Sequence, residues 1–136
     1  MIVNSHYKKL EEYYGRLGNI AGAEAMLHWD WATIMPNGGA ESRAAQLSEL
    51  SLIRHECLIN PELEELLDEA ESNRQSLEPW QNANLREMRH CWLHANALPT
   101  ELVGKLSKSS SHCEMIWRSA KKDNDLFNVI NGDKEV

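Results

Sequence analysis

Apolar positions in the first third of the chain recur at spacings of three, four or seven residues, as on one face of an α-helix. The stripe consists of Tyr7, Leu10, Tyr14, Leu17, Ala21, His28 and Trp31. It predicts one long helix, or two stacked helices, with this face turned to a core. Glycine inside a helix costs up to about 1 kcal/mol relative to alanine, so we expect a kink or a close helix contact near Gly18.

Four further helices follow from breaks in the same pattern. The turn at residues 36–39, Pro-Asn-Gly-Gly, separates the first helix from a second at about 40–58. A third, at about 61–73, has Asn60 as its cap and Pro61 as its first residue. The helical period then runs from residue 79 to an interruption at Leu98-Pro99, and from there to about Lys122.

The last two helices each have a predicted core face. The fourth helix should turn inward Trp80, Ala83, Leu85, Met88, Trp92 and Ala95, and the fifth Leu102, Leu106, Ser109, Cys113, Ile116 or Trp117, and Ala120. No segment alternates with the two-residue period of a strand. The sequence therefore predicts an all-α protein, an antiparallel bundle of about five helices that forms one domain over residues 1–136.

Composition narrows the function classes. Hydrophobic residues make up 42% and charged residues 26% of 136 residues, which is ordinary for a folded soluble protein. No apolar run approaches the roughly 20 residues of a membrane span, and the N-terminus lacks a basic region followed by an apolar one, so we expect a cytoplasmic protein. The formal charge of −7 argues against nucleic-acid binding. Cys57, Cys91 and Cys113 are too few and too widely spaced for a disulfide framework or a metal knuckle.

The segment His90-Cys91-Trp92-Leu93-His94 comes nearest to a zinc motif, because histidines four residues apart lie on one side of a helix. A zinc peptidase motif has glutamate after the first histidine, where it acts as the general base, and this chain has Cys91 there. Surface or packing histidines are the favoured interpretation, and an adventitious metal site is the alternative.

Other candidate motifs are incomplete. His112-Cys113-Glu114 resembles half of a nucleobase deaminase signature whose other half is missing from the sequence. A run of acidic residues is typical of a solvated helix face; it comprises Glu62, Glu64, Glu65, Asp68, Glu69 and Glu71. The sequence therefore assigns no catalytic, cofactor-binding or metal-binding residue, and no cofactor to the chain itself.

The string from His28 to Pro36 differs from these motifs, because two tryptophans, an acid and a threonine directly precede the turn. Its polar atoms need partners if they are buried. The string also carries a family resemblance: Trp29-Asp30, Thr33, Met35-Pro36, Gly38-Gly39, Arg43 and Gln46-Leu47 resemble the N-terminal signature of the carboxypeptidase Taq metallopeptidases. A second block continues the resemblance with Pro79-Trp80-Gln81, Ala83 to Met88, Arg89, Trp92 and Ala97-Leu98-Pro99, and the match covers most of residues 7–125.

The resemblance implies an all-helical cytoplasmic peptidase several times this length, often dimeric, that removes C-terminal residues from peptides with one divalent metal, usually zinc. It also implies that the metal-binding motif lies downstream of the matched region, so that this chain alone is inactive. After Asp125 the family continues with another helix, whereas residues 126–136 run into polar sequence. We therefore expect a truncated or frameshifted product, or a trimmed one.

In a full-length family enzyme these helices would pack against later helices. Without those helices we expect some apolar faces to be exposed, and we therefore expect a homo-oligomer. The faces expected to meet a second copy carry Leu10, Tyr14 and Leu17 on the first helix and Leu102, Leu106 and Ile116 on the fifth. Two alternatives to an inactive remnant stay open. One is a helical interaction module that self-associates or binds a full-length carboxypeptidase, and the other is a small metal-dependent enzyme that uses His90 and His94.

Overall fold

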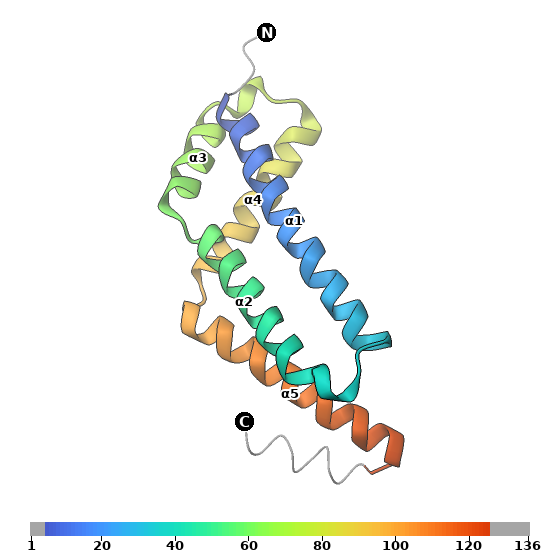
Figure 1. Ribbon diagram of the computed structural model, residues 1–136. Coiled ribbons are helices and arrows are strands. Elements are labelled where there is room, and N and C mark those ends of the chain that lie inside the picture. The colour runs from blue at the N-terminus through green and yellow to red at the C-terminus, as the bar shows by residue number, and fades with distance from the viewer. Residues whose placement is uncertain (1–4, 126–136) are drawn as a thin grey trace.

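The computed structural model describes residues 5–125, which form five α-helices joined by short connections (Figure 1). The helices are α1 (Ser5–Thr33), α2 (Ala40–Leu58), α3 (Pro61–Ser72), α4 (Pro79–Asn96) and α5 (Thr100–Asp123). Short 3-10 turns at Asn37–Gly39 and Arg74–Ser76 lead into α2 and α4. No strand occurs within these residues, and the predicted all-α class with five helices is confirmed.

The helix boundaries follow local capping chemistry. The side chain of Asn60 accepts a hydrogen bond of 3.0 Å from the Glu62 amide, and Pro61 occupies the first position of α3. At the start of α4 the side chain of Gln81 accepts a 2.9 Å bond from the Glu78 amide. At the end of α5 Asn124 adopts the left-handed conformation, with φ of 54°. These signals explain why the predicted breaks agree with the observed ones.

Helix α1 is continuous through its glycines, and a Cβ placed at Gly18 would meet no atom within 4 Å. The close helix contact expected there is absent from the described part of the chain. The buried face also differs from the predicted stripe, because Ala21 and His28 are exposed. The buried positions are Tyr7, Leu10, Leu17, Glu24 and Trp31. Four of them lie seven residues apart, which keeps them close to one line along the helix.

Two apolar clusters hold the helices together. The larger joins α1, α3, α4 and the end of α2, with Leu10, Leu63 and Leu67 fully enclosed at 0% exposure. Hydroxyl groups of α1 add cross-links: Tyr13 donates to the Cys57 carbonyl at 2.8 Å, and Tyr14 to the Met88 carbonyl at 2.5 Å. The smaller cluster surrounds Trp31 where α1 ends and α2 begins.

Helix α5 packs along α2 through small residues, which was not predicted. A Cβ at Gly104 would lie 3.3 Å from Leu52 Cδ2, so this glycine permits the close approach of the two helices. Ser111 and Ala120 are the fully buried residues of α5. Leu102 and Leu106, predicted to face the core, are 40% and 51% exposed. The predicted face of α5 is thus confirmed at Ala120, but its two leucines are exposed.

The fourth helix shows a smaller difference, since Leu85, Met88 and Ala95 are buried as predicted but Trp80 and Ala83 are exposed. The change in sequence pattern after Asp125 lies outside the described residues. None of the helices in residues 5–125 combines the length and the apolar composition required to cross a membrane.

Leu67 tests the larger cluster. Leu67→Ala should lower the free energy of unfolding by about 2–5 kcal/mol, because the side chain is fully enclosed and its loss leaves a cavity. Urea unfolding followed by circular dichroism measures the change. Glu65→Ala, at an exposed position of the same helix, is the control and should change stability by no more than about 0.5 kcal/mol. Equal losses in both variants would contradict the assigned core.

Candidate functional site

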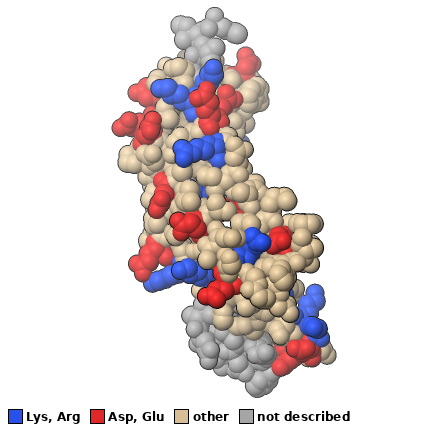
Figure 2. Space-filling view, in the orientation of Figure 1, with Lys and Arg blue, Asp and Glu red and all other residues tan. Residues whose placement is uncertain are grey.

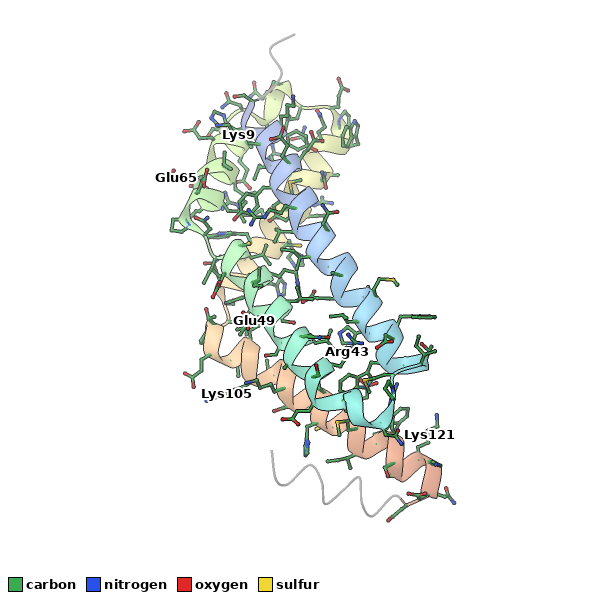
Figure 3. The ribbon with its side chains drawn as sticks, viewed as in Figure 1. Lys9, Arg43, Glu49, Glu65, Lys105 and Lys121 are labelled. Carbon is green, nitrogen blue, oxygen red and sulfur yellow. The ribbon has the colours of Figure 1, made fainter. Side chains whose placement is uncertain are left out.

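The string from His28 to Pro36 joins the end of α1 to the start of α2. Asp30 accepts a hydrogen bond of 2.5 Å from the Arg43 guanidinium, and both side chains are 24% exposed. Arg43 also donates to Gln46 Oε1 at 2.7 Å, and it lies between α1 and α2 (Figure 3). Thr33 donates to the Trp29 carbonyl at 2.7 Å. Asp30 and Thr33 therefore find partners, and the ion pair joins the two helices across the turn at residues 34–39. Trp31 Nε1 and Arg43 Nε, in contrast, are buried without a hydrogen-bond partner among the described residues.

Trp31 occupies the centre of this junction. Its side chain is 1% exposed, and its carbonyl accepts a hydrogen bond from Arg118 of α5. Arg118 also pairs with Glu114 at 3.4 Å. Three helices meet here, which indicates a structural role for the string. Trp29, by contrast, is 55% exposed.

His90 and His94 lie on the exposed side of α4, with their Nε2 atoms 3.0 Å apart and their ring centroids 4.4 Å apart. A metal bound at both nitrogens would need further ligands. Within residues 5–125 no group of three or more His, Cys, Asp or Glu side chains is arranged to hold a metal ion. The donor set of the described chain therefore does not fit a catalytic metal.

The other residues that the sequence offered as candidate site residues either lie apart from one another or form ion pairs within the chain. His112 is exposed on α5, and Glu114 is engaged by Arg118. On α3 only part of the acidic run is solvated, because Glu71 pairs with Arg89 at 2.7 Å and Asp68 contacts the same guanidinium. The hydrogen bonds that Arg89 donates to Glu71 raise the pKa of Arg89 above its ordinary value. Charged side chains of both signs are scattered over the face seen in Figure 2, with no concentrated basic patch on that face.

A groove between α1 and α5 is a further feature that the sequence did not predict. Two adjoining cavities, of ≈ 490 and ≈ 340 Å³, share the lining residues Ser51, Arg54, Leu98 and Val103, so they form one groove. Helix α2 forms its floor, α1 and α5 form its sides, and the end of α4 closes one end. We call this feature the α1–α5 groove.

The floor of the α1–α5 groove contains a buried polar cluster. Glu24, 8% exposed, accepts hydrogen bonds from Ser51 at 3.0 Å and from Arg54 at 2.9 Å. His55 is 5% exposed and its Nε2 atom has no hydrogen-bond partner in the described structure. Sequence reasoning missed Glu24, although its spacing of seven residues from Leu17 and from Trp31 was a usable signal. A carboxylate already held by a guanidinium and a hydroxyl is a structural group rather than a free general base.

The chain matches a known protein family and is similar to longer proteins. The family described as Carboxypeptidase Taq (M32) metallopeptidase matches residues 9–132. Thermostable carboxypeptidase 1 of Thermus thermophilus is 29% identical over 127 residues, which make up 92% of this chain and 25% of that protein. Thermostable carboxypeptidase 1 of Pyrococcus furiosus is 29% identical over 123 residues, 90% of this chain and 24% of that protein.

Among solved structures, metallocarboxypeptidase 1 of Trypanosoma cruzi superposes with a TM-score of 0.75 at 32% identity. The superposition covers 96% of this chain and 26% of that one. The chain thus spans about a quarter of the length of the relatives it matches.

The Asp30–Arg43 pair can be tested by Asp30→Asn, which keeps the size of the side chain but removes its charge. The variant should lose about 1–2 kcal/mol of unfolding free energy, because it leaves the partly buried Arg43 without its counter-charge. Chemical denaturation measures the loss. Glu87→Gln is the matched control: Glu87 pairs with Arg86 at 3.5 Å, but both side chains are mostly exposed. An equal loss in the control would contradict a specific role for the Asp30–Arg43 pair.

The histidine pair gives a second test. Replacing both His90 and His94 with alanine should change the unfolding free energy by no more than about 1 kcal/mol, because both rings are exposed. A chelator should leave the melting temperature of the unmodified chain unchanged. A large drop in melting temperature, reproduced by chelation of the unmodified chain, would instead reveal a structural metal at this pair.

Proposed function

We infer, from the fact that this chain belongs to the carboxypeptidase Taq (M32) metallopeptidase family, that it is the N-terminal helical part of a metal-dependent carboxypeptidase. Such an enzyme removes C-terminal residues from peptides. We further propose that the chain is catalytically inactive by itself. The proposal retains the cytoplasmic location expected from the sequence.

One observation supports the proposal of inactivity: the family consists of metallopeptidases, but the described residues do not provide a set of metal ligands. The relatives are carboxypeptidases, yet residues 5–125 bring together no three side chains that could hold a metal. The closest sequence candidate offers two histidines and has Cys91 where a zinc peptidase has its glutamate. A metal-bound water at that pair would have no carboxylate base in the motif position.

Three acidic side chains, of which Glu24 is buried and the other two are partly exposed, hold helices together. Asp30 holds Arg43, Glu24 holds Arg54, and Glu71 holds Arg89. Each acid therefore has a cation beside it and is not available to take a proton from water. This distribution supports a scaffold role, in which these helices supply structure and the remaining part of a family enzyme supplies the chemistry.

A second candidate function is an interaction module that self-associates or binds a full-length carboxypeptidase. The open α1–α5 groove favours it, because an apolar groove beside exposed leucines is a typical protein-binding surface. The two functions are compatible, since a chain without catalytic groups can still bind a partner.

The activity prediction uses the purified chain with added Zn²⁺ and blocked dipeptides as substrates. The rate of release of the C-terminal residue should equal the buffer background, with or without a chelator, because the chain lacks a complete metal site. Thermostable carboxypeptidase 1 of Thermus thermophilus, assayed in parallel, shows that the conditions support a relative's activity. Activity that copurifies with this chain and disappears with the chelator would refute the proposal.

A further inference from the structure

We propose that His90 and His94 form a binding site for a divalent transition metal ion with octahedral or square-planar coordination, such as Ni²⁺, on the outer side of α4. The two imidazoles supply neighbouring ligands, and water molecules supply the others. The proposal goes beyond the function proposed above, because it assigns metal binding to this pair and no catalysis.

The separation of the two ring nitrogens sets the angle at a metal ion bound to both. The Nε2 atoms of His90 and His94 lie 3.0 Å apart. With metal–nitrogen bonds of about 2.0–2.1 Å, this separation gives an angle of about 91–97° between the two bonds. A tetrahedral ion needs about 109°, whereas neighbouring ligands of an octahedral or square-planar ion lie at about 90°. The pair therefore favours Ni²⁺ or Cu²⁺ over Zn²⁺.

Helix packing holds the backbone of the two histidines in place. Both rings are exposed, but Met88 and Ala95 of the same helix segment are 5% and 8% exposed. Tyr14 of α1 also donates a hydrogen bond of 2.5 Å to the Met88 carbonyl. The two imidazoles thus start from fixed positions on α4. Binding then costs mainly the rotamer freedom of two exposed side chains, which lowers its entropic cost.

The charges around the pair permit a cation to bind. Arg86 and Arg89 lie on the same helix, but each has an acidic partner, Glu87 at 3.5 Å and Glu71 at 2.7 Å. The chain as a whole has a formal charge of −7, which attracts a divalent cation at longer range. Because both rings are exposed, the ion can also keep its water ligands.

The number of donors restricts the kind of site. A structural zinc site has four protein ligands and a catalytic one has three. The described residues contain no group of three His, Cys, Asp or Glu side chains that could hold a metal ion, so the chain supplies two ligands here. Cys91 follows His90 directly and lies about 100° around the helix axis from it, so we expect it to stay outside the site.

Calorimetric titration of the full chain, without a histidine tag, with NiCl₂ measures the affinity. One Ni²⁺ should bind per chain. His90→Ala and His94→Ala should each raise the dissociation constant at least about tenfold, because each removes one of two protein ligands. His112→Ala, at an exposed histidine of α5, is the matched control and should leave it unchanged. Binding that survives both single variants, or that weakens equally in the control, would overturn the assignment.

The melting temperature gives an independent measurement, because only the folded helix places the two histidines on one side. Ni²⁺ at about 100 times its dissociation constant should raise the melting temperature of the unmodified chain by at least about 3 °C. At the same concentration the rise in His94→Ala should be about half as large or smaller. The same rise in both proteins, or no rise in the unmodified chain, would contradict a site at this pair.

The ligands and the coordination geometry can be tested separately. Cys91→Ser should leave the Ni²⁺ affinity unchanged, and a loss would show that the thiolate is a ligand and overturn the site of two imidazoles. Zn²⁺ should bind more weakly than Ni²⁺, because the angle of about 91–97° is too small for a tetrahedral ion. Tighter binding of Zn²⁺ would contradict the proposed geometry.

Nuclear magnetic resonance locates the bound ion, since paramagnetic Ni²⁺ broadens the signals of nearby nuclei. Amide signals of residues 88–96 should broaden first, while those of residues 112–123, at the end of α5 remote from α4, should stay sharp (Figure 1). Broadening centred elsewhere would overturn the proposal. These measurements do not involve hydrolysis, so their failure would leave the proposal of an inactive carboxypeptidase part untouched.

Discussion

The interface between α1 and α2 is the constraint on which the other helices depend. Polar contacts fix it at three levels: Asp30 with Arg43 near the turn, Glu24 with Arg54 at the middle, and the Tyr13 hydroxyl with the Cys57 carbonyl at the far end. Each contact has a directional hydrogen bond, so together they set the register of the two helices as well as their distance. Apolar packing alone would allow one helix to slide along the other at lower cost.

The position of α2 explains both the packing of α5 and the groove. Helix α5 approaches α2 through Gly104 and Ser111, and small residues allow the helix axes to come close. With α5 packed in this way, Leu102 and Leu106 remain 40% and 51% exposed. The groove is the space left on α2 between its two neighbours. The exposed leucines and the open groove thus both result from the way in which α5 packs on α2.

The parts of this fold that sequence reasoning could predict are those decided locally. Asn60, Pro61 and the turn at residues 36–39 act on their own backbone, and so the breaks and the helix count were correct. The parts that failed are decided by neighbours. Glycine and serine carry no apolar signal, so the predicted face of α5 included Leu102 and Leu106 and left out Gly104 and Ser111, although it correctly included Ala120. A buried acid such as Glu24 is likewise hidden from an apolar pattern, because only its partners on α2 make its burial tolerable.

The string around Trp29-Asp30 shows how a sequence signature can identify a family without containing catalytic residues. Its recognition led to the correct family, yet its acid and tryptophan are used to join α1, α2 and α5. A helix junction places strict demands on residue type, since Arg43 must reach Asp30 while Trp31 packs against Ala40 and Leu47. Such demands give a signature as specific as that of a catalytic site. Assigning chemistry therefore requires a donor set with the right number and arrangement of ligands, and in residues 5–125 that requirement is not met.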